Sequence, residues 1–327
     1  MRGDTHRKYR SYFANALKFQ IQESNEKKLI SIISHGLRNF SNEISEPIAS
    51  AYQKTLNTIT TELLINIFFG VSTPSKNFKS MLDKYNRLGP DGLVWNVEEE
   101  QRKVYMEIVS DVEELISVSL AEKSQLRPGV LSKMIEADVS IDETVIGNLI
   151  YMVEMGRFDM YSLFRWLTKF LVDNPEITLA ISESENLDLA RAFVFETLRM
   201  EQSEGLIREA NEDFVFDGYL IPKGAALRLC LWEPHKFDDP FTDPFNFNPN
   251  RFLDENYSIE QYAPFGLDQH RCPAGDMVIA LSSLFVHTLV REFDIECLSD
   301  GPPFRGVYHW QPGKDFAVRL IEKTLQT

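Results

Sequence analysis

The sequence predicts a mainly α-helical protein with small β-sheets near its C-terminal part. Apolar residues recur at three- and four-residue spacing up to about residue 200, which is the period of an amphipathic helix. Beyond that point, short runs of β-branched and aromatic residues alternate with glycine, proline and aspartate, as is typical of strands and turns. No repeat or linker divides the chain, so we expect a single domain over residues 1–327.

Four segments carry the helical prediction. Apolar periodicity predicts helices over residues 56–70, 98–123, 140–176 and 190–200. We expect the first to end on Gly70, and the third to begin with a capping box of Ser140 and Glu143. Asn174-Pro175 should close the third helix, because proline disfavours helix at the residue before it.

The remaining segments predict short strands and one more helix. Residues 214–232 contain two β-rich runs around Pro222-Lys223-Gly224 and predict a hairpin. The loop PFGLDQHRCPAG, residues 264–275, precedes the apolar run MVIALSSLFVHTLV, which predicts a helix. Residues 293–321 predict short strands.

Composition narrows the function classes. The formal net charge of -15 argues against a nucleic-acid binder, because phosphate binding requires a basic face. No apolar run approaches the ~20 residues that span a bilayer, so we expect no membrane insertion. The three cysteines have no disulfide or metal-site spacing, which favours a reduced, cytoplasmic setting. These features indicate a small-molecule substrate.

Glu196 and Arg199 share one face of a predicted helix that is otherwise apolar. Charges on such a face must be paired, and Arg251 in NPNRF is a candidate third member of a buried triad. Glu99 and Arg102 have the same spacing, but their helix is highly charged and favours a solvated face.

Cys272 stands at the mouth of a predicted helix. A free cysteine is usually a small buried hydrophobe. Here, however, backbone N–H groups of a helix start favour a thiolate, and His270 and Arg271 supply donors for anions. Together with Phe265, this pattern suits a heme iron with carboxylate side arms.

The loop containing Cys272 resembles the cysteine loop of the cytochrome P450 family. Phe265, Gly266, His270, Cys272 and Ala274 fit the family pattern, whereas Asp268 stands where glycine is usual. FETLR resembles the family's Glu-x-x-Arg helix, and FNPNRF resembles its Pro-x-Arg-Phe segment, in the expected order. The resemblance implies a cytochrome P450 fold in which Glu196, Arg199 and Arg251 form the structural triad.

The resemblance also implies a cofactor, heme b (iron protoporphyrin IX), with Cys272 as the iron ligand and Phe265 beside it. RGDTHRKYRSYF resembles the helix that follows the family's first substrate loop. The implied propionate anchors are His6, Arg10, Arg208 and His270. On this match the upstream sheet, the early helices and that loop are absent, as in an N-terminally short, soluble, bacterial-type member. For His6 and Arg10, a basic solvated terminus remains the other interpretation.

The central helix departs from the family at its oxygen-activating stretch. Gly156 corresponds to the small residue that makes room for a ligand, Phe158 replaces the usual acid, and Asp159 replaces the usual alcohol. Either Asp159 handles protons alone, or activation of O2 is not the task. A third interpretation is that Asp159 pairs with Arg157 or Arg165.

The expected activity is oxidation of a small organic molecule in specialised biosynthesis, by a monooxygenase served by a ferredoxin or reductase partner. The resemblance places Met155 and Glu204 beside the substrate, and the polar loop QSE suits an amine or a polyol. A solvent-facing turn is the alternative for that loop. Peroxide-using, isomerase, dehydratase or cyclase chemistry remains open, as does a catalytically inactive protein that stabilises a partner.

Overall fold

The computed structural model describes most of the chain. The described residues are 3–17, 23–42, 48–88, 98–121, 128–201, 205–254, 256–306 and 310–324. They form a mainly α-helical body with four two-stranded antiparallel sheets. The predicted fold class is therefore confirmed.

Eleven α-helices are present in the described ranges. They are α1 (Gly3–Leu17), α2 (Glu23–Ser41), α3 (Ile48–Phe69), α4 (Lys76–Arg87), α5 (Glu99–Ala121), α6 (Val130–Glu136), α7 (Glu143–Asp173), α8 (Pro175–Glu183), α9 (Asp188–Met200), α10 (Arg251–Asp254) and α11 (Gly275–Glu292). Among the described residues of the C-terminal half are the short 3-10 helices η2 (Glu233–Lys236) and η3 (Asp268–His270).

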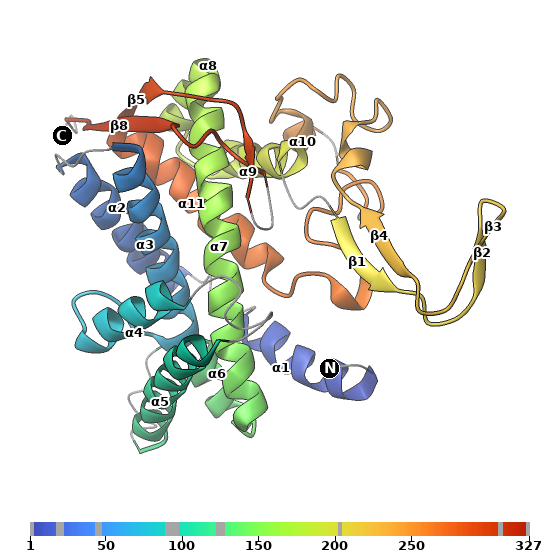
Figure 1. Cartoon of the computed structure of the whole chain (residues 1–327). Helices are drawn as coiled ribbons and strands as arrows, with labels where there is room; N and C mark the ends of the chain where they lie inside the picture. The colour runs from blue at the N-terminus through green and yellow to red at the C-terminus, as the bar shows by residue number, and fades with distance from the viewer. Residues whose placement is uncertain are drawn as a thin grey trace.

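Helix α7 is the centre of the molecule. It runs through the body from end to end (Figure 1) and packs against α3, α5, α9 and α11. Its apolar side chains join one continuous core with those of α3 and α11, where the Phe164 and Phe285 rings stack with their centroids 4.0 Å apart. A helix buried on most sides can present only a short stretch to a ligand, so the placement of α7 decides the site.

The helix ends agree with the sequence in two cases and differ in one. Gly70 follows α3 with φ +68, and Asn174 caps α7, both as predicted. The predicted capping box of Ser140 and Glu143 is wrong, because Asp142 is the N-cap of α7. Its carboxylate accepts a hydrogen bond from the Val145 N–H at 2.9 Å.

The strands pair differently from the predicted hairpin. The hairpin consists of β2 (Phe214–Phe216) and β3 (Tyr219–Ile221), which meet at Asp217 and Gly218. Both turn residues have positive φ, +49 and +80, which is the geometry that a two-residue hairpin loop favours. Pro222-Lys223-Gly224 instead leads into β4 (Ala226–Cys230), which pairs with β1 (Gly205–Glu209).

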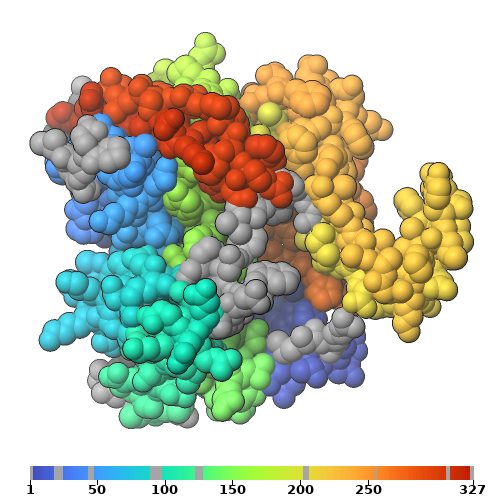
Figure 2. Space-filling view, viewed as in Figure 1, coloured from blue at the N-terminus to red at the C-terminus, as the bar shows by residue number. Residues whose placement is uncertain are grey.

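The C-terminal strands confirm the prediction for residues 293–321. Strand β5 (Phe293–Ser299) pairs with β8 (Ala317–Glu322), and β6 (Phe304–Arg305) pairs with β7 (Trp310–Gln311). Sheet β5–β8 packs on α2, α3 and α11, whereas the β2–β3 hairpin projects from the body (Figures 1 and 2). Within the described ranges, no helix combines the length and the apolar character needed to cross a bilayer.

Candidate heme-thiolate site

Cys272 lies on a tight loop between η3 and α11. Its backbone N–H donates to the Phe265 carbonyl at 2.8 Å, which closes the loop. The Phe265 ring packs on Gly275, where a Cβ would come within 3.1 Å of a ring carbon. Glycine therefore lets the phenyl ring and the first turn of α11 approach each other closely, and the predicted arrangement of loop and helix is confirmed.

Two residues of this loop adopt the left-handed conformation. Gly266 has φ +79 and Asp268 has φ +55. Aspartate tolerates this region better than most side chains, so Asp268 can make the turn at the position where the family usually has glycine. Gly266 lies against Leu206, because a Cβ there would be 3.2 Å from the leucine Cδ1. This contact places the start of β1 beside the cysteine loop.

Burial raises the pKa of the Cys272 thiol above its ordinary value. A backbone hydrogen bond from Ala274 opposes this shift, and so do the charges of Arg10 and Arg271, whereas the Asp159 carboxylate adds to it. A half-buried thiol with cations nearby is poised for a metal, because coordination deprotonates a thiol outright.

Helix α1 brings cationic groups to the same loop. The His6 and His270 rings lie 4.8 Å apart, and the Arg10 guanidinium donates to the Arg271 carbonyl at 2.6 Å. The pKa of His6 is lowered, first by partial burial and then by His270 and Arg10. The structure thus gathers three of the four predicted propionate anchors around Cys272.

Arg208, the fourth predicted anchor, lies on β1. It is half-buried and shares a face of the strand with Leu206, two residues earlier, which contacts the cysteine loop. Its guanidinium donates to the Ile207 carbonyl at 2.9 Å. The donor set of a half-buried thiol, two histidines and two arginines fits a metal cofactor that carries anionic arms.

Helix α7 faces the loop with Asp159 and Met155. Asp159 is exposed, and its carboxylate influences the thiol of Cys272 and the phenol of Tyr151. Met155 is half-buried and lies one turn earlier on the same face. The carboxylate of the predicted proton-handling residue therefore acts electrostatically on the predicted iron ligand, although 113 positions separate 159 from 272 in the sequence.

Gly156 and Phe158, in the same stretch of α7, contact Leu64 of α3 and Arg157 of α7 respectively. The place of a Cβ on Gly156 lies 3.2 Å from a Leu64 methyl, so the glycine permits close packing of α7 on α3. Its role in making room for a ligand stays a prediction. Phe158 is half-buried, with its ring centroid 4.2 Å from the Arg157 guanidinium carbon.

Arg157 and Arg165, the suggested partners of Asp159, are engaged elsewhere. Arg157 forms a buried ion pair with Glu154 at 2.9 Å. Arg165 donates to the Gln311 side chain at 3.1 Å and to backbone carbonyls of the following two residues. Asp159 lies on the face of α7 opposite to that of Arg157, because two residues advance a helix by about 200°.

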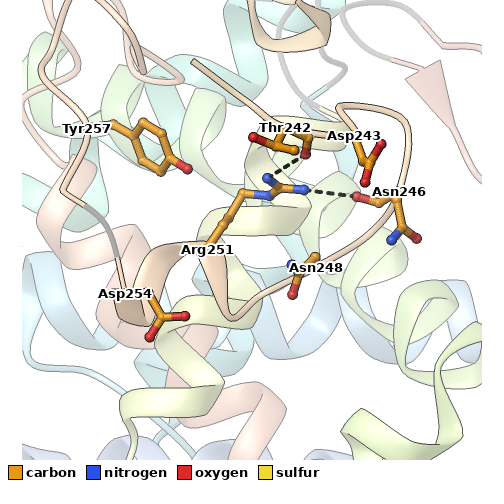
Figure 3. A pocket seen from close by; sticks show the side chains of 7 residues that line it. All are labelled: Thr242, Asp243, Asn246, Asn248, Arg251, Asp254 and Tyr257. Carbon is orange, nitrogen blue, oxygen red and sulfur yellow. Dashed lines mark hydrogen bonds between the residues drawn. The ribbon is translucent and has the colours of Figure 1, made fainter. Parts of the chain in front are cut away.

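The predicted structural triad is present. The Glu196 carboxylate accepts hydrogen bonds from the Nε–H of Arg199 at 2.8 Å and from the Nε–H of Arg251 at 3.2 Å. All three side chains are buried. Arg251 also donates to the backbone carbonyls of Thr242 and Asn246 (Figure 3). The hollow of about 200 Å³ in Figure 3 belongs to the loop around this triad.

Sequence reasoning missed two buried charged groups. Glu154 and Arg157 repeat the Glu-x-x-Arg spacing on an apolar helix face, and that signal would have identified them. Beside the triad, burial raises the pKa of Glu201 to about 7 and lowers that of Lys236 to about 8. Glu204, a predicted substrate contact, lies outside the described residues.

Comparison with known proteins agrees with this geometry. The profile of the family described as Cytochrome P450 matches residues 171–306, which include the triad and the cysteine loop. The chain is 27% identical over 243 residues to Cytochrome P450 family 716 subfamily AD polypeptide 4 of Melia azedarach, covering 67% of this chain and 51% of that protein. It is 28% identical over 182 residues to abscisic acid 8'-hydroxylase 1 of Arabidopsis thaliana, covering 49% and 39%.

Solved structures share the fold. Retinoic acid-bound CYP120A1 from a cyanobacterium superposes with a TM-score of 0.79 at 18% identity, covering 99% of this chain and 80% of that one. The chain spans about half the length, or less, of the curated relatives named above. The matched motifs, the buried triad and the seated cysteine loop agree with one another: residues 171–306 match the cytochrome P450 family, and the described fold is a cytochrome P450 fold.

Proposed function

We propose that this chain is a heme-thiolate oxidoreductase that oxidises a small organic molecule. The observation that carries the proposal is the position of Cys272, on a closed loop among His6, Arg10 and His270 and facing Asp159. Relatives named as hydroxylases and oxidases support an oxidation.

The residues present fit heme b. Cys272 would ligate the iron, Phe265 would pack beside it, and His6, Arg10, Arg208 and His270 would bind the propionates. When bound, such a group supplies oxidising chemistry at its iron, and electron donation from the cysteine favours cleavage of an O–O bond.

The chain's own residues bind, orient and move protons. Asp159 is exposed on the face of α7 that influences Cys272, so its carboxylate can exchange protons with solvent and pass them toward the distal side. Phe158 stands beside it as an apolar residue in place of the family's usual acid. Met155 and Glu204 would contact the substrate.

A second candidate activity rests on the same pair of residues. Phe158-Asp159 lacks the usual acid and alcohol, and a peroxide user or a non-redox isomerase, dehydratase or cyclase would not need them. A monooxygenase would receive electrons from a ferredoxin or reductase, whereas a peroxide user would need no such partner. A cytoplasmic location and a bacterial-type origin remain predictions from the sequence.

The reduced, carbon monoxide-bound absorption spectrum tests the proposal. We expect the purified chain with heme to show the red-shifted Soret band of a thiolate ligand, and Cys272→Ser to lose that band. Cys230→Ser and Cys297→Ser are matched controls, because both thiols are exposed and distant from the loop in sequence. A Cys272→Ser protein that retains the band would refute the assignment.

The oxidant is then identified by turnover. The same holoenzyme is assayed with a panel of small organic substrates, once with hydrogen peroxide and once with a ferredoxin, its reductase and NADPH. Product formation only with the electron-transfer system supports the monooxygenase, and product formation only with peroxide supports the second activity. A chain that binds no heme in any preparation would instead favour a catalytically inactive partner protein.

A further inference from the structure

Helix α7 contains a fully buried ion pair near its middle. Glu154 is 0% exposed and Arg157 is 2% exposed, and two hydrogen bonds of 2.9 and 3.0 Å join them. The pair lies three residues apart and brackets Met155 and Gly156. It therefore occupies the stretch of helix that carries the proposed distal residues.

The Arg157 guanidinium also connects α7 to two other helices. Its Nη2 atom donates to the Tyr85 carbonyl at 2.6 Å and to the Leu88 carbonyl at 2.9 Å. These carbonyls lie at the C-terminal end of α4, where a helix lacks partners of its own. Its Nη1 atom donates to the Asn57 side chain on α3 at 3.3 Å. All three nitrogen atoms are engaged, so the group is fixed in one orientation.

Phe158 rests on this fixed group. The guanidinium carbon lies 4.2 Å from the centroid of the Phe158 ring, within the range of a cation–π contact. Asp159 follows directly and faces the opposite side of α7, because two residues advance a helix by about 200°. The contacts of Arg157 thus determine where the Phe158 ring lies.

Stability alone is a poor explanation for the pair. Taking two charges out of water costs about as much free energy as their attraction returns, and apolar residues of similar volume often serve equally well. A buried arginine that reaches the end of another helix instead provides geometry, since its planar fork forms several directed bonds at once.

We propose that Arg157 is a positioning residue that couples the end of α4 to the distal stretch of α7 and holds the Phe158 ring as a wall of the substrate pocket. The inference rests on the proposed function, because the pocket is the distal side of the heme site. Glu154 acts through Arg157 by orienting it. Neither side chain needs to touch the substrate.

Imidazole, which binds heme iron from the distal side, is the probe. We expect Arg157→Lys to raise the dissociation constant for imidazole, read from the Soret shift of the holoenzyme, by about three-fold or more. Lysine keeps the charge but loses the planar surface beneath the ring and the bidentate bonds to Glu154. Glu154→Gln should act in the same direction, because it removes one of those bonds.

A double-mutant cycle separates positioning from general damage. In a Phe158→Leu background the ring is absent, so Arg157→Lys should change imidazole binding by less than about two-fold. Lys84→Gln is the matched control. It removes an ion pair between α4 and α5, the bonds of 2.6 and 2.7 Å to Asp111, without touching α7. We expect it to leave imidazole binding unchanged.

Three results would overturn the proposal: an unchanged or lower dissociation constant in Arg157→Lys, the same change in both backgrounds, or an equal change in Lys84→Gln. Each would show that Arg157 acts only as a structural residue or not at all. An intact thiolate Soret band in the wild type, obtained beforehand, separates such a failure from failure of the heme assignment.

Hydrogen exchange decides the question even without heme. We expect Arg157→Lys to accelerate amide exchange about ten-fold both at residues 85–88 and at residues 155–160, because it releases both elements. Lys84→Gln should accelerate only the first segment. If exchange at residues 155–160 is unchanged in Arg157→Lys, the proposed coupling between α4 and α7 does not exist.

Discussion

Two glutamates with the same motif have opposite environments. Glu196 is buried and receives both Arg199 and Arg251, whereas Glu99 and Arg102 are exposed at the start of α5. The spacing alone does not separate them. The apolar neighbours of Glu196 do, because a charge among them must be paired to be tolerated.

Glu196→Gln tests how much the buried ion pairs of Glu196 contribute to stability. We expect the free energy of unfolding to fall by about 3 kcal/mol, because the change leaves two guanidinium groups buried without their anion. Urea denaturation measures it. Glu99→Gln is the control and should leave the urea midpoint unchanged, since its carboxylate is solvated. Equal midpoints for the two variants would contradict the assignment of a structural triad.

The buried His235 side chain should make the stability of the protein depend on pH. Burial, followed by Arg199 and Lys236, lowers the pKa of His235 to about 4. Between pH 4 and its ordinary value of 6.5 the unfolded chain binds more protons at this site, so stability is lost as pH falls through that window.

We expect His235→Gln to reduce this acid sensitivity by about 2 kcal/mol, compared between pH 7 and pH 4.5 by urea denaturation. The backbone carbonyl that binds Arg199 remains in this variant. His35→Gln is the control, because His35 is exposed. If His235→Gln and His35→Gln lose the same free energy of unfolding between pH 7 and pH 4.5, His235 is not the source of the acid sensitivity.

The sequence alone was sufficient to predict some residues of the site but not others. Cys272, Glu196 and Arg251 could be predicted, because each lies in a short motif whose residue types indicate its physical role. The three-helix contact of Arg157 could not, because its partners at Tyr85 and Leu88 are backbone carbonyls, which carry no sequence signal.

At the scale of elements, the start of α7 shows how a capping signal is misread. Ser140 and Glu143 have capping-box spacing, yet the helix begins one residue after Asp142. The Asp142 carboxylate caps Val145, accepts a hydrogen bond from the Tyr9 hydroxyl at 2.7 Å, and has a lowered pKa as a result. One side chain therefore both starts α7 and joins it to α1.

Asp142→Ala should destabilise the protein by about 1 to 2 kcal/mol, because it removes the cap and the contact with α1. Thermal unfolding measures the loss. Ser140→Ala is the control and should have little effect, since Ser140 is exposed and is not the cap. Tyr9→Phe isolates the contact with α1. An equal loss for Ser140→Ala would restore the capping box.

Strand pairing was the least predictable element. The runs at 214–221 and 226–230 were both identified as β-rich, but their partners were not. Asp217-Gly218 closes the local hairpin, whereas β4 crosses to β1, which precedes the hairpin in the sequence. Local turn chemistry can be read in the sequence, but a nonlocal partner requires knowledge of the fold.

On the scale of the whole molecule, the site forms where segments far apart in the sequence come together. Arg10 and the Arg271 carbonyl are 261 positions apart and hydrogen-bonded, and Asp159 reaches the same loop from the central helix. Hydrophobic periodicity predicted the segments of α3, α5, α7, α9 and α11 but not this convergence. The resemblance of three ordered motifs to a known family supplied it, and the structure confirms that α1 lies against the cysteine loop.

The β2–β3 hairpin is an exposed apolar projection of the molecule (Figures 1 and 2). Val215, Phe216, Tyr219 and Leu220 are each 66–74% exposed. A two-stranded hairpin is marginally stable by itself, and exposed apolar strands promote association between chains. We therefore expect the purified chain to self-associate through this hairpin as its concentration rises.

The paired substitution Val215→Lys and Leu220→Glu tests this expectation. The two residues are directly opposed in the hairpin, so the new charges attract each other across the strands and should preserve its pairing. Light scattering over a concentration series should show less association, with a melting temperature within about 2 °C of the wild type. Val215→Lys with Leu220→Lys supplies the same solubility but opposes like charges, so it should loosen the hairpin without restoring association. Unchanged scattering in both variants would show that another surface drives the contact, because neither would then have altered the interface.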